Sequence, residues 1–252
     1  MADPDPVRPG AADVPTVSVV MPAYNEAEML AASVTDVVDG LRGRGLAFEV
    51  IVVENGSRDA TAALADAAAA EHPEVLALHR ADPDYGEALR AGLLAARGDT
   101  VVNFDVDYYD LTFVDDARAR LAAPDRPAVV VGSKRAAGAE DRRSPLRKLV
   151  TGVFTTILRS GFGLRVSDTH GMKALDRAAV VPVARDCHFG TDLFDTELVL
   201  RCERAGLAVV ELPVVVVERR PSRSPIWRRV PRTVGGLVRL RVLLWREGRR
   251  RA

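Results

Sequence analysis

Short apolar runs alternate with longer helical stretches along the first part of the chain. Each run has the length of a buried strand and ends in a polar turn that leads into an amphipathic or alanine-rich stretch. The pattern predicts strands at residues 17–21, 48–53, 75–79 and 100–105, and helices at 25–42, 61–71 and 86–97. Asn25 is placed to cap the first of these helices. Strands that alternate with such helices favour an α/β fold, a mostly parallel sheet flanked by helices.

The later part of the chain is less regular, and residues 132–145 have the composition of a polar loop. Further strands are predicted at residues 129–131 and 207–217, and further helices at 146–158, 191–205 and 225–246. Thr191 is placed to cap the second of these helices. The last predicted helix carries apolar residues at helical spacing among arginines.

Composition limits the class of protein. The chain has 252 residues, of which 48% are hydrophobic, enough for one large domain with a substantial core. We expect a disordered leader over residues 1–15, one folded domain over 16–218, and a basic loop with a C-terminal amphipathic helix over 219–252. Cys187 and Cys202 match no metal or redox spacing, which favours reduced thiols in an intracellular protein.

The formal net charge is zero, but the charge is unevenly placed. From Arg219 onward the sequence has twelve arginines and a single acid, Glu247. The tail helix could rest on an anionic membrane or pack on the body or on a second subunit, since its apolar positions are also spaced for a core. We therefore expect a cytoplasmic protein and leave open both peripheral contact with the inner face of the membrane and a homodimer. No nucleic-acid partner is expected.

Two carboxylates follow the strand that ends near residue 105. Asp105 and Asp107 stand one residue apart where the strand should stop, and in an open α/β sheet ligands bind at that edge. Burying two ionised carboxylates this close costs several kcal/mol unless a cation compensates. A divalent cation with oxygen ligands is the economical explanation. The loops after the first two strands should meet the pair there, bringing Tyr24, Asn25, Glu54 and Asn55 around one cleft.

Six motifs occur in the order seen in glycosyltransferase family 2. They are Pro22-Ala23-Tyr24-Asn25-Glu26, the turn over residues 54–61, Asp105-Val106-Asp107, Gly132-Ser133-Lys134, the segment over residues 168–173, and Phe194-Asp195-Thr196-Glu197. The chain resembles this family over roughly residues 16–241, and most closely its dolichyl-phosphate mannose and glucose synthases. The resemblance implies a GT-A fold (nucleotide-diphospho-sugar transferase, Rossmann-like), a GDP- or UDP-sugar as partner, and Mg²⁺ or Mn²⁺ as cofactor.

The resemblance also implies roles for individual residues. Nucleotide contacts are expected from Pro22, Ala23, Tyr24, Glu26, Glu54, Asn55 and Asp105. Phosphate contacts are expected from Lys134, Arg219, Arg220, Ser222 and Arg223, although a solvated basic loop also explains the last four. Metal ligands are expected from Asp105, Asp107 and His188, the histidine because a late histidine sometimes completes the metal shell in this fold. Asp192, Asp195 and His170 are the candidates for a catalytic acid or base.

The chain departs from the family pattern at several positions. Glu54-Asn55 stands where the family usually has two aspartates, and residues 82–86 replace a loop rich in lysine and glycine. Tyr108-Tyr109-Asp110-Leu111 follows the metal pair, where relatives that use polyprenyl phosphates tend to have polar residues, histidine and paired prolines. The loop at His170 is one residue short. These changes concern the acceptor more than the donor.

Three functions fit this reading. The first is inverting transfer of a sugar from a nucleoside diphosphate to an acceptor. The second is a flavin-independent mutase that interconverts pyranose and furanose forms of a sugar nucleotide through the same metal and diphosphate site, which requires a closed pocket. The third is a non-catalytic protein that binds sugar nucleotides without turnover.

Overall fold

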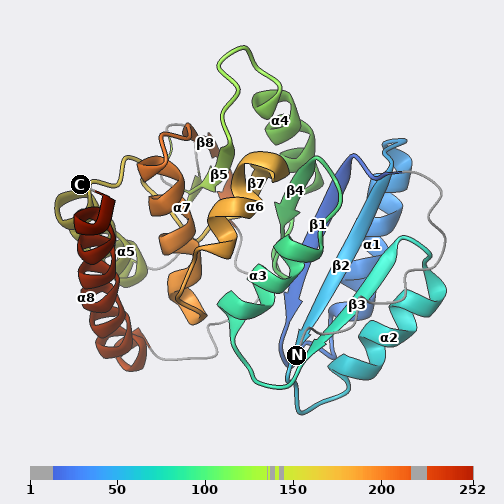
Figure 1. Cartoon of the computed structure of the whole chain (residues 1–252). Helices are drawn as coiled ribbons and strands as arrows, with labels where there is room; N and C mark the ends of the chain where they lie inside the picture. The colour runs from blue at the N-terminus through green and yellow to red at the C-terminus, as the bar shows by residue number, and fades with distance from the viewer. Residues whose placement is uncertain (1–13, 135, 137–139, 142–144, 217–225, 252) are drawn as a thin grey trace.

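The computed structural model describes residues 14–134, 136, 140–141, 145–216 and 226–251. Seven strands form one sheet in the spatial order β3-β2-β1-β4-β7-β5-β8 (Figure 1). They are β1 (Val17–Ala23), β2 (Phe48–Asn55), β3 (Val75–Arg80), β4 (Thr100–Asn103), β5 (Val129–Ser133), β7 (Lys173–Asp176) and β8 (Val209–Pro213). The predicted mostly parallel sheet is confirmed, because β7 alone of these strands runs antiparallel to its neighbours β4 and β5.

Helices cover both faces of the sheet. They are α1 (Leu30–Gly43), α2 (Thr61–Glu71), α3 (Tyr85–Ala95), α4 (Leu111–Leu121), α5 (Pro145–Phe162), α6 (Arg177–Arg185), the 3-10 helix η1 (Thr191–Leu193), α7 (Phe194–Arg204) and α8 (Ile226–Arg251). One core lies between the sheet and α1, α2 and α4, and a second lies between the sheet and α3, α6 and α7. Every residue of β1 and β2 is buried, which explains why their sequences are mainly apolar.

A third core joins the last helices to one another, at the end of the sheet where β8 lies. Leu158 of α5, Leu200 of α7 and Leu240 of α8 belong to this cluster, and each is almost fully buried. The C-terminal helix therefore packs on the body of the protein, lying beside α5 and α7 (Figure 1).

The structure corrects both predicted helix caps. The first helix begins at Leu30 rather than at residue 25, because Asn25 adopts a left-handed conformation (φ 54°) and its side chain accepts a hydrogen bond from Arg58 N instead. Thr191 likewise has φ 55° and lies in η1, so α7 begins at Phe194 without a side-chain cap.

Other elements were absent from the prediction or differ in extent. The short strand β7 and the helices α4 and α6 were not predicted. The predicted strand at residues 207–217 divides into β8 and β9 (Val215–Val216), which pairs with β6 (Glu140–Asp141) in a separate two-stranded sheet. The last helix extends to Arg251.

Candidate functional site

The carboxyl ends of β1, β2 and β4 meet at one edge of the sheet, because these strands are parallel and adjacent. The register pairs Ala23 with Glu54, and Val20 with Asn103, so Asp105 follows the end of β4 at this edge. The sequence predicted this convergence from the alternation of strands and helices, which implies parallel strands. We call this region the Asp105 edge.

A tight turn presents the two aspartates. Asp105 and Tyr108 exchange backbone hydrogen bonds of 3.2 Å in both directions, which places Asp107 inside the turn. The Ser33 hydroxyl donates to Val106 O at 2.7 Å and fixes the turn to α1. The Tyr85 hydroxyl, at the start of α3, donates to Asp105 Oδ1 at 3.2 Å. Both the backbone and the first carboxylate are therefore held from neighbouring helices.

Negative charge is concentrated at Asp105. Burial, followed by the nearby charges of Asp107 and Asp195, raises the pKa of Asp105 from its usual 3.8 to about 6. The Lys173 ammonium and the hydrogen bond from Tyr85 act in the opposite direction and do not cancel this shift. The Asp105 edge is thus a place where a cation relieves charge repulsion.

A buried ion pair lies behind the aspartates. The Lys173 ammonium donates to Asp195 Oδ1 at 2.7 Å and to Gly171 O at 2.9 Å. Both charged side chains are almost completely shielded from solvent, with exposed fractions of 1% and 3%. A buried pair of this kind persists when hydrogen bonds satisfy its partners, as they do here. The register of β7 sets Lys173 beside Asn103 at the end of β4.

The loops after β1 and β2 are tied to each other. Asn25 N donates to the Ser57 hydroxyl at 3.0 Å, and Arg58 N donates to Asn25 Oδ1 at 2.8 Å. Burial alone would raise the pKa of Glu54, but hydrogen bonds from the Ser57 backbone and side chain outweigh it and lower that pKa. Glu54 therefore stays ionised and holds its own turn.

Asp84 connects the Glu54 loop to the segment before α7. Its backbone N–H donates to Asn55 Oδ1 at 2.8 Å, and its carboxylate accepts from Thr191 N and from Glu87 N. This aspartate thereby caps α3 and joins two loops that lie far apart in the sequence.

The remaining predicted nucleotide contacts lie on the loop after β1. Pro22 and Ala23 are buried at the end of the strand, whereas Tyr24 is exposed. Glu26 N donates to the Thr61 hydroxyl at 2.8 Å, which fastens this loop to the start of α2.

Lys134 and His170 lie near the buried Asp168. The Lys134 ammonium is 3.9 Å from Asp168 Oδ2, and Asp168 Oδ1 accepts a hydrogen bond from His170 N at 3.0 Å. The His170 ring is exposed, with Nδ1 at 3.1 Å from the Thr169 hydroxyl and the ring edge-on to Phe154.

The structure does not bring His188 to the two aspartates. Within the described part of the chain, no three His, Cys, Asp or Glu side chains are grouped so that they could hold a metal ion. Glu197 instead accepts the backbone N–H groups of His188 and Phe189, at 2.9 and 2.8 Å, and the His188 ring lies 3.4 Å from the Arg201 guanidinium. The structure therefore does not group His188 with the aspartate pair, and metal binding by Asp105 and Asp107 stays a prediction.

Some predicted site residues lie outside what the structure describes. Arg219, Arg220, Ser222 and Arg223 fall between residues 217 and 225, outside the described residues. The Asp192 backbone belongs to η1, and its side chain is outside the described part. Their assigned roles stay predictions.

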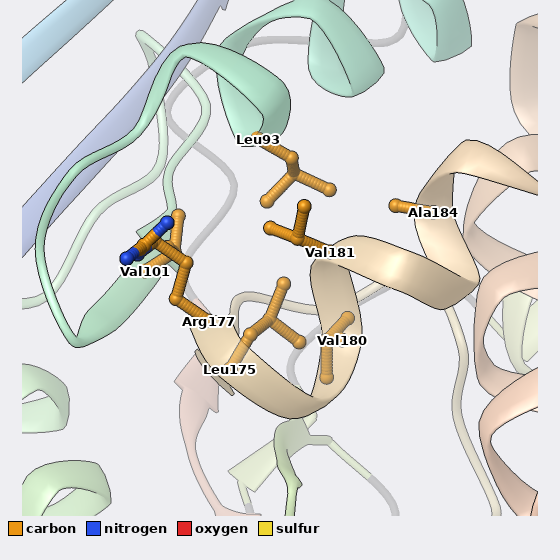
Figure 2. A pocket seen from close by; sticks show the side chains of 7 residues that line it. All are labelled: Leu93, Val101, Leu175, Arg177, Val180, Val181 and Ala184. Atoms are coloured by element: carbon orange, nitrogen blue, oxygen red, sulfur yellow. The ribbon is translucent and has the colours of Figure 1, made fainter.

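A small apolar space lies between α3 and α6 at the amino end of β4 (Figure 2). It is lined by Leu93, Val101, Leu175, Arg177, Val180, Val181 and Ala184 and is too narrow to hold a water molecule. Because Asp105 follows the opposite end of β4, this space plays no part in the site.

Sequence reasoning missed three residues of the Asp105 edge. Lys173 ends the motif at residues 168–173 and could have been proposed from it. Asp84 and Tyr85 lie in a segment that departs from the family pattern, so no motif pointed to them.

A family model described as glycosyl transferase family 2 matches residues 18–181. Among curated proteins, glycosyltransferase AglD of Haloferax volcanii is 36% identical over 224 residues, covering 85% of this chain and 35% of that protein. A dolichyl-phosphate beta-glucosyltransferase of Trichomonas vaginalis is 31% identical over 213 residues, covering 79% of this chain and 64% of that enzyme. The chain thus spans about a third of the first relative and just under two thirds of the second.

Solved glycosyltransferases share the fold. Glucosyl-3-phosphoglycerate synthase of Mycobacterium tuberculosis, in complex with Mn²⁺, UDP and phosphoglyceric acid, has a TM-score of 0.60 and 24% identity over 82% of this chain and 72% of that one. A mannosyltransferase of Pyrobaculum calidifontis, in complex with GDP-mannose and Mn²⁺, has a TM-score of 0.59 and 24% identity over 91% of this chain and 64% of that one. This likeness confirms the predicted GT-A architecture.

Proposed function

This chain belongs to glycosyl transferase family 2, as its motifs predicted, and we propose that it transfers a sugar from GDP or UDP to an acceptor with inversion at the anomeric carbon. One observation carries the proposal: Asp105 and Asp107 lie in one tight turn just after β4, at the edge where the carboxyl ends of β1, β2 and β4 meet, and their negative charges lie close to that of Asp195. Such unrelieved charge at the end of a central strand suits the binding of a cation together with a diphosphate.

The residues of the Asp105 edge fit Mg²⁺ or Mn²⁺. Asp105 and Asp107 supply hard oxygen ligands, and these metals commonly take one or two carboxylates while water and substrate phosphates complete the shell. A pair of protein ligands is therefore sufficient without His188. When bound, the metal would neutralise the charge of the leaving nucleoside diphosphate.

The protein's own groups hold the donor in place. Glu54, Asn55 and Asn25 form the linked loops at which we place the base and ribose, and Tyr85 fixes Asp105 in the orientation described above. Lys134 lies on the loop after β5, where we expect its ammonium to contact a phosphate.

The acceptor that best suits this site is a phosphate monoester carried by a lipid. The most plausible buried base, Asp195, is engaged by the Lys173 ammonium at 2.7 Å and is poorly placed to take a proton. A phosphate oxygen is already ionised near neutral pH and needs little base assistance, unlike a hydroxyl. The Trichomonas relative is a dolichyl-phosphate beta-glucosyltransferase, which agrees with this choice.

Donor turnover tests the proposal. The protein is incubated with GDP- and UDP-sugars and Mn²⁺, with and without a polyprenyl phosphate, and products are followed by chromatography and NMR. We expect glycosyl lipid only when the lipid phosphate is present. Isomerised sugar nucleotide without acceptor would establish the mutase instead, and binding without turnover would establish a non-catalytic protein.

The aspartate pair is tested with a matched substitution. Asp107→Ala should lower turnover by roughly three orders of magnitude, the scale of electrostatic contacts to a transition state. Asp116→Ala, which removes an exposed carboxylate from α4, should leave turnover unchanged. Retained activity in Asp107→Ala would refute the metal assignment.

A further inference from the structure

Large apolar side chains that remain exposed gather on α5 and α8. Their exposed fractions lie between 41% and 59%. They are Val153 and Ile157 on α5, and Val234, Val238, Val242 and Trp245 on α8. The two helices share the third core and lie beside each other in Figure 1. We call these six side chains the α5–α8 apolar surface.

The C-terminal helix has two apolar stripes rather than one. Leu237, Leu240 and Leu244 are buried in the third core. Val234, Val238 and Val242 follow one another at intervals of four residues along a different side of the helix and stay exposed. Packing on the body therefore accounts for the first stripe and leaves the second uncovered.

The sequence of α8 is strongly basic. Residues 226–251 contain nine arginines and one glutamate, a net charge of +8. The glutamate, Glu247, is turned onto Arg201 of α7, with two hydrogen bonds of 3.0 and 2.9 Å, so it does not offset the outer charges. Arg239, Arg246 and Arg249 are exposed, and the Arg249 guanidinium lies 4.1 Å from the centre of the Trp245 ring.

We propose that the α5–α8 apolar surface docks on an anionic phospholipid bilayer. Apolar side chains with a tryptophan and flanking arginines match the layer where lipid headgroups meet acyl chains. A second copy of the chain fits less well, because a symmetric contact through α8 would set one basic helix against another. Among the described residues no helix is long and apolar enough to cross a membrane.

The inference does not depend on the proposed chemistry, since no residue of the Asp105 edge belongs to this surface. If the acceptor is a lipid phosphate, docking would bring the protein to the leaflet that contains it. Membrane binding and nucleotide-sugar turnover are measured separately, so either proposal can fail without the other.

Vesicle flotation of the full chain tests the docking. Vesicles of phosphatidylcholine alone are compared with vesicles that also contain about 30% phosphatidylglycerol, and we expect the protein to float with the anionic vesicles and to be released by salt. Arg239→Gln combined with Arg246→Gln should weaken partitioning about thirtyfold, because each arginine near an anionic leaflet contributes a factor of roughly five. Equal flotation with both vesicle types would overturn the proposal.

The apolar contribution needs its own variant and control. Val238→Glu should abolish flotation, whereas Leu94→Glu, which places the same charge on an exposed apolar position of α3, should not. Thermal unfolding by circular dichroism checks that both variants fold. A dimer in sedimentation that Val238→Glu dissociates, together with no flotation of the wild type, would show that a second copy covers the surface.

The fluorescence of Trp245 tests the docking without changing any of the six side chains of the α5–α8 apolar surface. In the Trp227→Phe variant Trp245 is the remaining tryptophan, because the chain has two. Its emission should shift to shorter wavelength with anionic vesicles and be quenched by brominated acyl chains. An unchanged spectrum at saturating lipid would contradict insertion.

Discussion

The raised pKa of the Asp105 carboxyl group makes the stability of the folded protein depend on pH. The folded protein raises its pKa to about 6, from 3.8, through burial and the charges of Asp107 and Asp195. A raised folded-state pKa means that the folded chain holds this proton more tightly than the unfolded chain does. The resulting stability is fully present below about pH 4 and is lost as the pH rises through 6.

We therefore predict that metal-free protein loses roughly 2 kcal/mol of unfolding free energy between pH 4 and pH 7 from this group. Urea unfolding at a series of pH values measures the effect. Asp105→Asn should flatten this part of the profile, and Mn²⁺ should restore stability at pH 7. A profile that is identical in wild type and Asp105→Asn would disprove the assignment.

At the scale of residues, the sequence allowed site residues to be proposed where they belong to a local motif. It did not reveal site residues that are brought into place by the packing of helices on the sheet. Asp105 and Asp107 were found because two acids follow an apolar strand. Tyr85 reaches Asp105 through the placement of α3 over the sheet, which no local pattern encodes. His188 was assigned by analogy, and its loop is held elsewhere by Glu197.

At the scale of elements, the contact between α3 and η1 brings Asp84 and Tyr85 to the site. A methyl group on Gly86 would come within 2.7 Å of Gly190 C and Thr191 O and within 2.6 Å of Phe194 Cβ. These are backbone and core atoms that cannot move aside easily. The two elements therefore touch through a position where any side chain would collide.

We predict that Gly86→Ala destabilises the protein by about 2 kcal/mol and weakens sugar-nucleotide binding, since overpacking moves α3 and Tyr85. Denaturant unfolding and calorimetric binding measure the two effects. Gly161→Ala is the matched control, because nothing lies within 4 Å of the added methyl group and alanine favours the helix α5. Equal stability of the two variants would show that α3 and η1 can separate without cost.

Elements with strong periodicity were predictable, and elements defined by their neighbours were not. The strands β1 and β2 are mainly apolar, with Ser18 and Glu49 as the second residue of each strand. The strand β7 has four residues and begins with a lysine, so its sequence does not resemble a buried strand. The helices α4 and α6 begin after aspartate caps at Asp110 and Asp176, a signal that is present in the sequence. The helix α6 has nine residues and contains Pro182, which argues against a helix when the sequence is considered alone.

At the scale of the whole molecule, the division between a catalytic domain and a tail at residue 218 requires a test, because α8 shares a core with α5 and α7. We predict that Leu240→Ala, at a fully buried position of α8, costs about 3 kcal/mol and lowers the stability of the whole protein in one transition. Val238→Ala, two residues away and exposed, should change stability by less than about 0.5 kcal/mol.

Chemical denaturation followed by circular dichroism measures the change in unfolding free energy of both variants. Hydrogen exchange of the α8 amides shows whether α8 unfolds together with the body. If Leu240→Ala frees α8 alone while the body unfolds unchanged, the tail is an independent segment.

The fold class itself was predictable from the alternation of strands and helices. The uncovered second stripe of α8 was not, because sequence alone did not show which apolar positions the third core takes.

The reversed direction of β7 has a consequence for how this protein could be altered. In the parallel strands, loops that follow a strand reach the Asp105 edge, but β7 enters the sheet there and leaves on the far side, so the loop before β7 lies at the Asp105 edge. Extra residues inserted after Asp176 would therefore emerge remote from the chemistry. Changes in donor or acceptor preference should instead be sought upstream, in the loop that ends at Lys173.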